Sequence, residues 1–199
     1  MWRAVLGALV VTMAMLSFAG CGESDPDRIA RLLTNGLTST DPRIVCEGSL
    51  SPALLTRIYG GTARCHATES EPAERVSQAQ SVEVRGVRVH GGRATATVVI
   101  HGGNHDGARG ELSLRHKQGG WRVSELSAAL LRSQFEASIR RMRSIDGSLK
   151  RCVTRHMRTL SDAAFRTLAY GADELSRTQL SAVARRCQAL LAAAARVVA

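Results

Sequence analysis

Apolar residues change their spacing along the chain, and each change predicts a different kind of structure. An almost unbroken apolar stretch runs from Ala4 to Phe18. Apolar residues then recur at helical spacing between residues 28 and 59, and alternate with polar ones between 82 and 126. Helical spacing returns from about residue 128. The pattern therefore predicts an α+β protein with N-terminal helices, a curved antiparallel sheet and a small all-helical C-terminal region.

Three expected helix starts in the N-terminal part share one chemistry, a capping side chain followed by proline: Asp25-Pro26, Asp41-Pro42 and Ser51-Pro52. The side-chain oxygen accepts a hydrogen bond from a free backbone N–H group, and proline is tolerated in the first turn. The helix after Ser51 is expected to stop at Gly60, where glycine supplies a left-handed cap.

Period-two alternation begins at Val82 and predicts an antiparallel meander of at least four strands. Val82 and Val84 have one parity and Val87 and Val89 have the other, so a bulge at Gly86 is expected. Turns are expected at 91–92, 101–107 and 118–120.

The C-terminal region has an apolar stripe from Leu131 to Leu160, with a break expected at Gly147. A second helix is expected to end at Tyr170-Gly171, and a last one to begin after Asp173. The last helix should bury the apolar residues Leu180, Val183, Ala184, Cys187, Leu190, Leu191 and Ala194.

The order of helices and strands, with Gly-Gly-Trp-Arg-Val at 119–123, resembles the nuclear transport factor 2-like superfamily, or cystatin-like cone. The resemblance covers residues 25–127 and implies a cone-like sheet that encloses a cavity. We expect a signal peptide at 1–20, a tether at 21–27, a cone-like α+β domain at 28–127 and a basic helical tail at 128–199.

The N-terminus combines Arg3, the apolar stretch and Ala19-Gly20-Cys21. This combination resembles the signal peptide of a bacterial lipoprotein, which implies cleavage before Cys21 and diacylglyceryl attachment to its thiol. Two alternatives stay open: an ordinary signal peptide cut near Ala19, and an uncleaved N-terminal anchor.

Lipidation of Cys21 would leave an even number of cysteines, as expected in an oxidising compartment. The other four are Cys46, Cys65, Cys152 and Cys187, and they allow three connectivities. Proximity within each expected domain favours Cys46–Cys65 and Cys152–Cys187.

The positive charge is uneven. The chain has 27 basic and 17 acidic residues and a net charge of +10, of which residues 129–199 carry 13 basic and 5 acidic. On a tethered protein, such a tail could bind anionic lipids or cell-wall polymers. The basic residues that would do so are Arg140, Arg141, Arg143, Lys150, Arg151, Arg155 and Arg158. Nucleic acid is not expected as a partner, because no aromatic stacking surface accompanies the arginines.

No pattern predicts a metal site, a cofactor or catalysis. His101, His105 and Asp106 are expected in a solvated turn, His66 in a loop, and His90 and His116 at strand ends. Glu83, Glu111 and Glu125 fall where alternation points outward.

The sequence thus predicts a lipid-anchored protein at the outer face of the bacterial cytoplasmic membrane. It would act as a non-catalytic binding or scaffolding module for a small apolar ligand or an envelope protein. One alternative is a small cone-fold enzyme acting on a hydrophobic substrate. Another is attachment to anionic envelope polymers or lipids through the basic tail.

Overall fold

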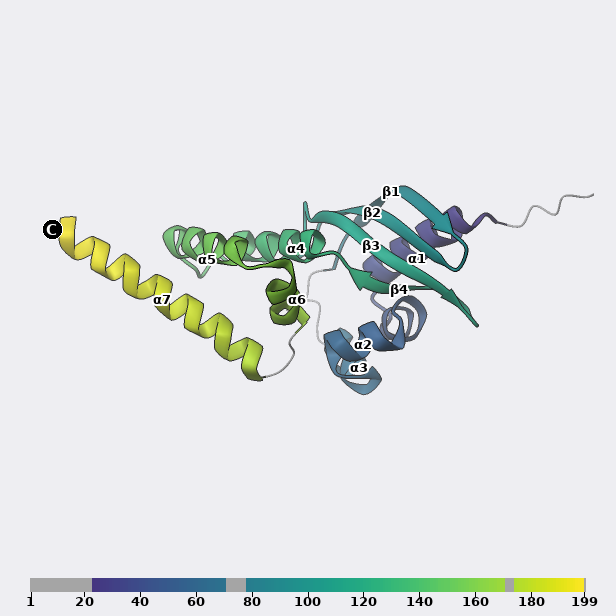
Figure 1. Ribbon diagram of the computed structural model, residues 1–199, viewed down its shortest axis with the longest axis horizontal. Coiled ribbons are helices and arrows are strands. Elements are labelled where there is room, and N and C mark those ends of the chain that lie inside the picture. Colours follow the sequence, from purple (N-terminus) through teal and green to yellow (C-terminus); the bar gives the residue numbers. More distant parts are fainter. Residues whose placement is uncertain (1–22, 71–77, 171–173, 199) are drawn as a thin grey trace, which may run out of the picture.

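The computed structural model describes residues 23–70, 78–170 and 174–198 (Figure 1). The expected signal peptide and Cys21 therefore lie outside the described residues.

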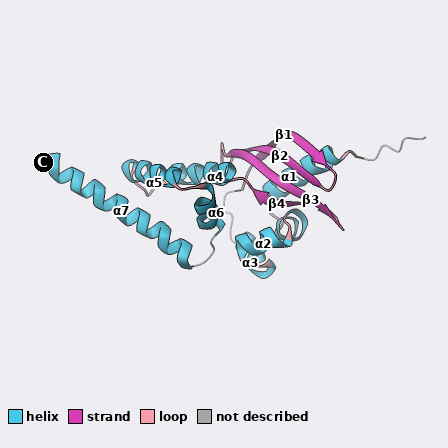
Figure 2. Cartoon of the chain, viewed as in Figure 1, coloured by secondary structure: helices cyan, strands magenta, loops and turns pink. Residues whose placement is uncertain are grey.

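In the described part of the chain, four helical segments precede the sheet and four helices follow it; Figure 2 shows how they are arranged around the strands. The first group is α1 (Asp25–Thr38), the π-helix η1 (Ile44–Ser49), α2 (Pro52–Tyr59) and α3 (Thr62–Glu69). The strands are β1 (Ser81–His90), β2 (Arg93–His101), β3 (Arg109–Lys117) and β4 (Gly120–Leu126). The second group is α4 (Ala128–Arg141), α5 (Gly147–Thr159), α6 (Asp162–Tyr170) and α7 (Glu174–Val198). The α+β class and the order of the elements are as predicted.

The four strands form one curved, open antiparallel sheet in the order β1-β2-β3-β4. The register of β1 against β2 shifts between Arg85 and Arg88, and Gly86 in the gap has a φ angle of 56°. The predicted bulge at Gly86 is therefore confirmed. The bulge lets the valines on both sides of Gly86 turn towards the core despite their opposite parity.

The helix starts are partly as predicted. Ser51 caps α2 through a bond from the Leu54 N–H, and Gly60 ends that helix with a φ angle of 79°. The cap of α1 is Ser24, not Asp25, so α1 begins inside the segment expected as a tether. His66 lies in α3 and not in a loop, because the helix resumes immediately after the Gly60-Gly61 turn.

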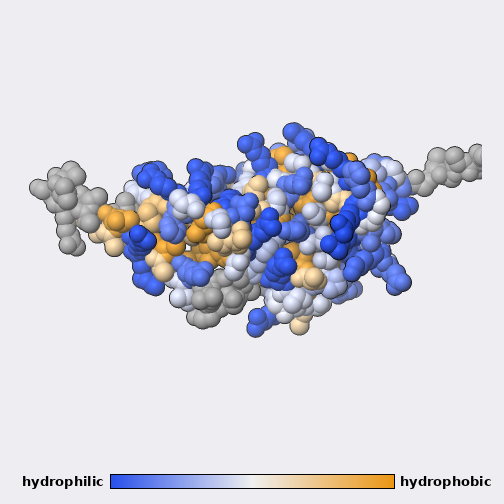
Figure 3. Space-filling model, in the orientation of Figure 1, coloured by the Kyte–Doolittle hydropathy of each residue, from blue (hydrophilic) through white to orange (hydrophobic). Residues whose placement is uncertain are grey.

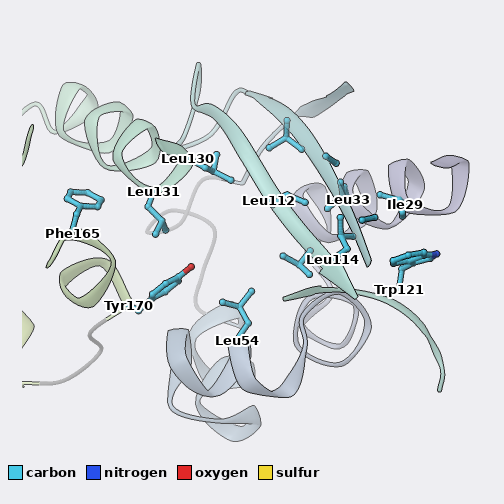
Figure 4. Packing of buried hydrophobic residues seen from close by; sticks show 14 of the residues in the cluster. Ile29, Leu33, Leu54, Leu112, Leu114, Trp121, Leu130, Leu131, Phe165 and Tyr170 are labelled. Atoms are coloured by element: carbon cyan, nitrogen blue, oxygen red, sulfur yellow. The ribbon is translucent and has the colours of Figure 1, made fainter. Parts of the chain in front are cut away.

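The hydrophobic core lies between the inner face of the sheet and the helices (Figure 4). Alternate residues of β2 and β3 face it, among them Val98, Leu112 and Leu114. The same core includes Leu130 of α4 and Phe165 of α6. α4 is therefore packed on β3, and α5 and α6 contribute to the same core. Of the described residues, none before Ile29 belongs to this core.

The C-terminal stripe is interrupted where the chain turns. α4 ends at Arg141 and Asp146 caps α5, so Met142 between them is 45% exposed and does not join the core as its spacing suggested. On α7, Cys187 is buried, but Leu180 and Leu190 are 36% and 59% exposed. Their predicted burial is wrong because α7 packs chiefly against α5 and α6 on one side. The side chains of Leu191 and Ala194 are outside the described set.

Both expected disulfides are present. Cys46 of η1 is bonded to Cys65 of α3, and Cys152 of α5 is bonded to Cys187 of α7. Each bond joins two elements that also pack against each other, and it stabilises their contact by restricting the unfolded chain.

Candidate functional site

A cavity of about 330 Å³ lies between the N-terminal helices, the inner face of the sheet and α4. Its wall is mainly aliphatic and combines residues from every layer of the fold. The aliphatic members are Leu32, Leu33, Leu37, Val45, Leu50, Ile58, Ala79, Val98, Ile100, Leu112, Val123, Leu126, Leu130, Leu131 and Ala169.

A close contact between β3 and α4 sets one wall of the cavity. A Cβ atom on Gly110 would lie 2.6 Å from the Cα and N atoms of Leu130. Only glycine permits this approach, which places Leu130 and Leu131 at the cavity wall.

Tyr59 and Glu69 form a polar pair on this wall. The Tyr59 hydroxyl donates a hydrogen bond of 2.6 Å to Glu69 Oε1 across the α2–α3 hairpin. Burial, followed by the bond to Glu69, raises the pKa of Tyr59 above its ordinary value. The phenol thus stays protonated and acts as a hydrogen-bond donor, not as a base.

Gln78, at the entrance to β1, lines the cavity, and its side-chain oxygen is buried. Among the described residues, no group donates a hydrogen bond to Gln78 Oε1. A buried acceptor without a partner is costly, and a donor on a bound molecule would remove that cost.

Tyr170 closes another part of the wall from α6. Its hydroxyl accepts a bond from the Leu126 N–H and donates to the Leu126 carbonyl, both at 3.2 Å. The Arg57 guanidinium lies 5.4 Å from the centre of the Tyr170 ring. Tyr170 is therefore already partnered, and its role here is to hold α6 against β4.

The cavity's polar members were not predicted from the sequence. Tyr59 and Tyr170 were expected only as the ends of helices, and Glu69 and Gln78 were not singled out. A useful signal was available for Tyr59, since an aromatic residue one turn after Leu55 continues the apolar face of α2.

The predicted turn after β2 is confirmed, although one of its residues reaches the cavity. Asp106 accepts a bond of 2.7 Å from the Gly102 N–H and pairs with Arg141 at 2.9 Å, and these contacts hold the pKa of Asp106 below its usual value. His105 lines the cavity margin, with Nδ1 3.3 Å from Ser138 Oγ. His101 ends β2.

Within the described residues, no group of three or more histidine, cysteine or acidic side chains is arranged to hold a metal ion. Glu125 is half-exposed and pairs with Arg166 at 2.8 Å, while Glu111 is exposed and Glu83 is bound by Arg85. None of these three acids lines the cavity.

The seven basic residues predicted to bind polyanions lie around the α4–α5 hairpin, but they do not all remain free. Arg141 pairs with Asp106, and Arg158 forms a two-bond ion pair with Glu136 at 2.8 and 2.9 Å. Lys150 Nζ donates to the Arg140 carbonyl at 3.1 Å. The side chains of the four remaining members of this set, Arg140, Arg143, Arg151 and Arg155, are exposed.

In the described part of the chain, no helix is both long enough and apolar enough to cross a membrane. Comparison with protein-family models, curated proteins and solved structures finds no match to this chain.

Proposed function

We propose that this chain is a lipid-anchored extracytoplasmic protein that binds a small, largely apolar molecule in the cavity without catalysis. The observation that carries the proposal is the aliphatic cavity of about 330 Å³, which has the size and lining of a small-molecule site. The buried, unpartnered Gln78 oxygen adds a directional contact, so the preferred ligand carries a hydroxyl or another donor on an apolar body.

Non-catalytic binding is favoured by the state of Tyr59 and Glu69, the hydrogen-bonded pair on the cavity wall. Catalytic acids and bases generally have pKa values near the working pH. The pKa of Tyr59 moves away from neutrality, because burial and Glu69 both favour the protonated phenol. Oε1 of Glu69 in turn accepts the hydrogen bond from the Tyr59 hydroxyl at 2.6 Å, so this oxygen is already occupied.

The rival function is a small enzyme acting on a hydrophobic substrate, and the Tyr59–Glu69 pair on the cavity wall is the observation in its favour. Glu69→Gln separates the two functions. A binding protein should keep its ligand affinity, because an amide oxygen still accepts the Tyr59 bond. An enzyme that uses the carboxylate should lose turnover while still binding its substrate.

The proposed location rests on the cysteines. Two disulfides are typical of proteins that fold in oxidising compartments, and lipid on Cys21 would account for the fifth cysteine. Two acyl chains would hold the protein firmly, since each buried methylene contributes about 0.8 kcal/mol.

Mass spectrometry of the intact protein from the membrane fraction tests the anchor. The expected mass is that of a chain beginning at Cys21 with a diacylglyceryl group. Cys21→Ser should release the protein from membranes. If this variant stays in the membrane fraction, the apolar stretch is the anchor and the lipoprotein assignment fails.

Binding of the apolar fluorescent probe N-phenyl-1-naphthylamine tests whether the cavity takes up an apolar molecule. Leu37 is half-buried on the cavity wall, so Leu37→Trp should fill part of the cavity and reduce probe binding. Ile145→Trp is a matched control, because Ile145 is also half-buried but lies outside the cavity. Equal probe binding by both variants would show that the probe does not occupy this cavity.

A further inference from the structure

The outer face of the sheet collects basic side chains that are far apart in the sequence. In the strand register, His90 lies opposite Arg93, Arg93 opposite Arg115, and Arg115 opposite Arg122. Arg88 lies in the adjacent row, opposite Thr95. We call the outward-facing residues at this end the basic sheet end: Arg88, His90, Arg93, Arg115, Lys117 and Arg122.

These charges are not neutralised within the sheet. Among the described residues, none forms an ion pair with Arg88, Arg93 or Arg115, and all three side chains are exposed. The nearest acid in the register, Glu125, is held by Arg166 at 2.8 Å. Like charges on directly opposed strand positions repel one another and destabilise a sheet. A row of this kind therefore has no stabilising role within the fold.

The basic sheet end also contains a shallow groove of about 270 Å³. The side chains of Arg88, Arg93 and Arg115 line it, together with half-buried hydroxyl residues and Glu125. The hydroxyl residues are Thr95, Ser113 and Ser124. Guanidinium groups and hydroxyls together are the donors that recognise phosphate oxygens.

The basic sheet end lies at the same end of the molecule as the start of α1. Trp121, at the start of β4, donates a bond of 3.0 Å from Nε1 to Asp25 Oδ1 in the first turn of α1. Figure 1 shows the β1–β2 and β3–β4 hairpins and the start of α1 at one end, with the strands in front of α1. In the same view, Figure 3 shows many hydrophilic residues over the sheet. The four residue-to-residue steps from Cys21 to Asp25 span at most about 14 Å.

We infer that the basic sheet end docks on the phosphate headgroups of anionic phospholipids in the bilayer that carries the anchor. The choice of a bilayer over a soluble polymer rests on the proposed lipid anchor, because the anchor would hold this end of the fold within reach of the headgroups. The interaction would orient the protein and turn the opposite end, with α5 and α7, away from the membrane. The tail arginines would then not be the membrane-binding surface.

Vesicle co-sedimentation of the unlipidated chain beginning at Gly22 tests the docking without the anchor. This chain retains every described residue, and no described residue before Ile29 belongs to the core. It should bind vesicles that contain phosphatidylglycerol, bind pure phosphatidylcholine vesicles poorly, and lose affinity as salt rises.

The triple variant Arg88→Gln, Arg93→Gln, Arg115→Gln should bind about 100-fold more weakly, since each arginine near an anionic surface contributes about fivefold. The matched control is Arg140→Gln, Arg143→Gln, Arg155→Gln, which removes the same charge from the tail and should bind like the wild type. The first variant should melt at the same temperature or slightly higher, because repulsion within the row is relieved.

Three results would overturn the inference: equal loss of affinity in both triple variants, retention of affinity in the first, or binding to soluble polyphosphate but not to the anionic vesicles. The last would identify an anionic polymer as the partner. Each leaves the anchor untested, and release of Cys21→Ser from membranes reports on the anchor separately.

Discussion

Replacing Gly110 with alanine should separate α4 from the sheet and damage the cavity in the same step. The added Cβ would lie 2.6 Å from the Leu130 Cα, N and Cβ atoms. Carbon atoms in ordinary contact are about 3.5–4.0 Å apart, so β3 and α4 must move apart by about 1 Å. Two of the opposing atoms belong to the helix backbone, so a change of rotamer cannot relieve the overlap.

Overpacking of this kind costs about 1–3 kcal/mol, and the rigid backbone places Gly110→Ala near the upper value. The smaller conformational freedom of alanine in the unfolded chain returns about 0.4–1 kcal/mol. The net expectation is a loss of about 2 kcal/mol in the free energy of unfolding, or about 4–8 °C in Tm for a chain of this size. Affinity for N-phenyl-1-naphthylamine should fall as well, because Leu130 and Leu131 line the cavity.

Urea denaturation followed by circular dichroism measures the change, with Gly92→Ala as the matched control. Gly92 lies in the β1–β2 turn without a positive φ angle, and an added Cβ would lie 3.8 Å from the nearest atom, an ordinary contact. Its unfolding free energy should stay within about 0.5 kcal/mol of the wild type. If Gly110→Ala is equally harmless, α4 is not pinned to β3 by close contact, and the account of the cavity wall is wrong.

Three other predictions follow from particular contacts. Replacing Cys152 and Cys187 with serine should lower the free energy of unfolding by about 4 kcal/mol, because the bond spans 35 residues; replacing Cys46 and Cys65 should lower it by about 3 kcal/mol for a span of 19 residues. Equal stability of the reduced and oxidised wild type would contradict both values. The bond from Arg158 lowers the pKa of Glu136 from its ordinary 4.5, so the stabilising effect of this ion pair is present above about pH 4.5 and is lost as the pH falls below that value. Glu136→Gln should therefore show a shallower loss of Tm in acid than the wild type. An unchanged acid profile would rule the pair out as a contributor to stability. Gln78→Met should leave the unliganded protein as stable as the wild type or more stable, because it removes a buried acceptor without a partner. It should also weaken the binding of a long-chain alcohol relative to the matching alkane. An unchanged preference between alcohol and alkane in calorimetry would exclude Gln78 from ligand recognition.

Much of the local structure was predictable because it depends on neighbouring residues alone. Ser51 followed by Pro52 marks the start of α2, and the change of parity across Gly86 marks the bulge, since both follow from backbone sterics and short-range hydrogen bonds. Errors arose where two local signals compete. Ser24 and Asp25 are both good caps, and only the hydrogen bond from the Asp27 N–H identifies Ser24.

Burial on the last helix was harder to predict because periodicity marks an apolar face without identifying what covers it. Leu180 and Leu190 follow the spacing of Cys187, yet α7 meets α5 and α6 along only part of that face. In the candidate site, the aliphatic lining follows from strand alternation at residues such as Val98 and Leu112. Its polar members come from separate elements, and no spacing connects Tyr59 with Gln78.

The sequence by itself determined the α+β class, the strand alternation, the turns and the favoured disulfide pairing, because these follow from side-chain periodicity and short chain separations. The tertiary structure alone decided where charge and polarity gather. Counting charged residues along the chain locates the excess of positive charge after residue 128. Two of the arginines there, Arg141 and Arg158, are nevertheless paired with Asp106 and Glu136. Strand register instead brings Arg93, Arg115 and Arg122 into one row. Register and helix docking join residues that are distant in sequence, and that is why the cavity and the basic sheet end emerge only in three dimensions.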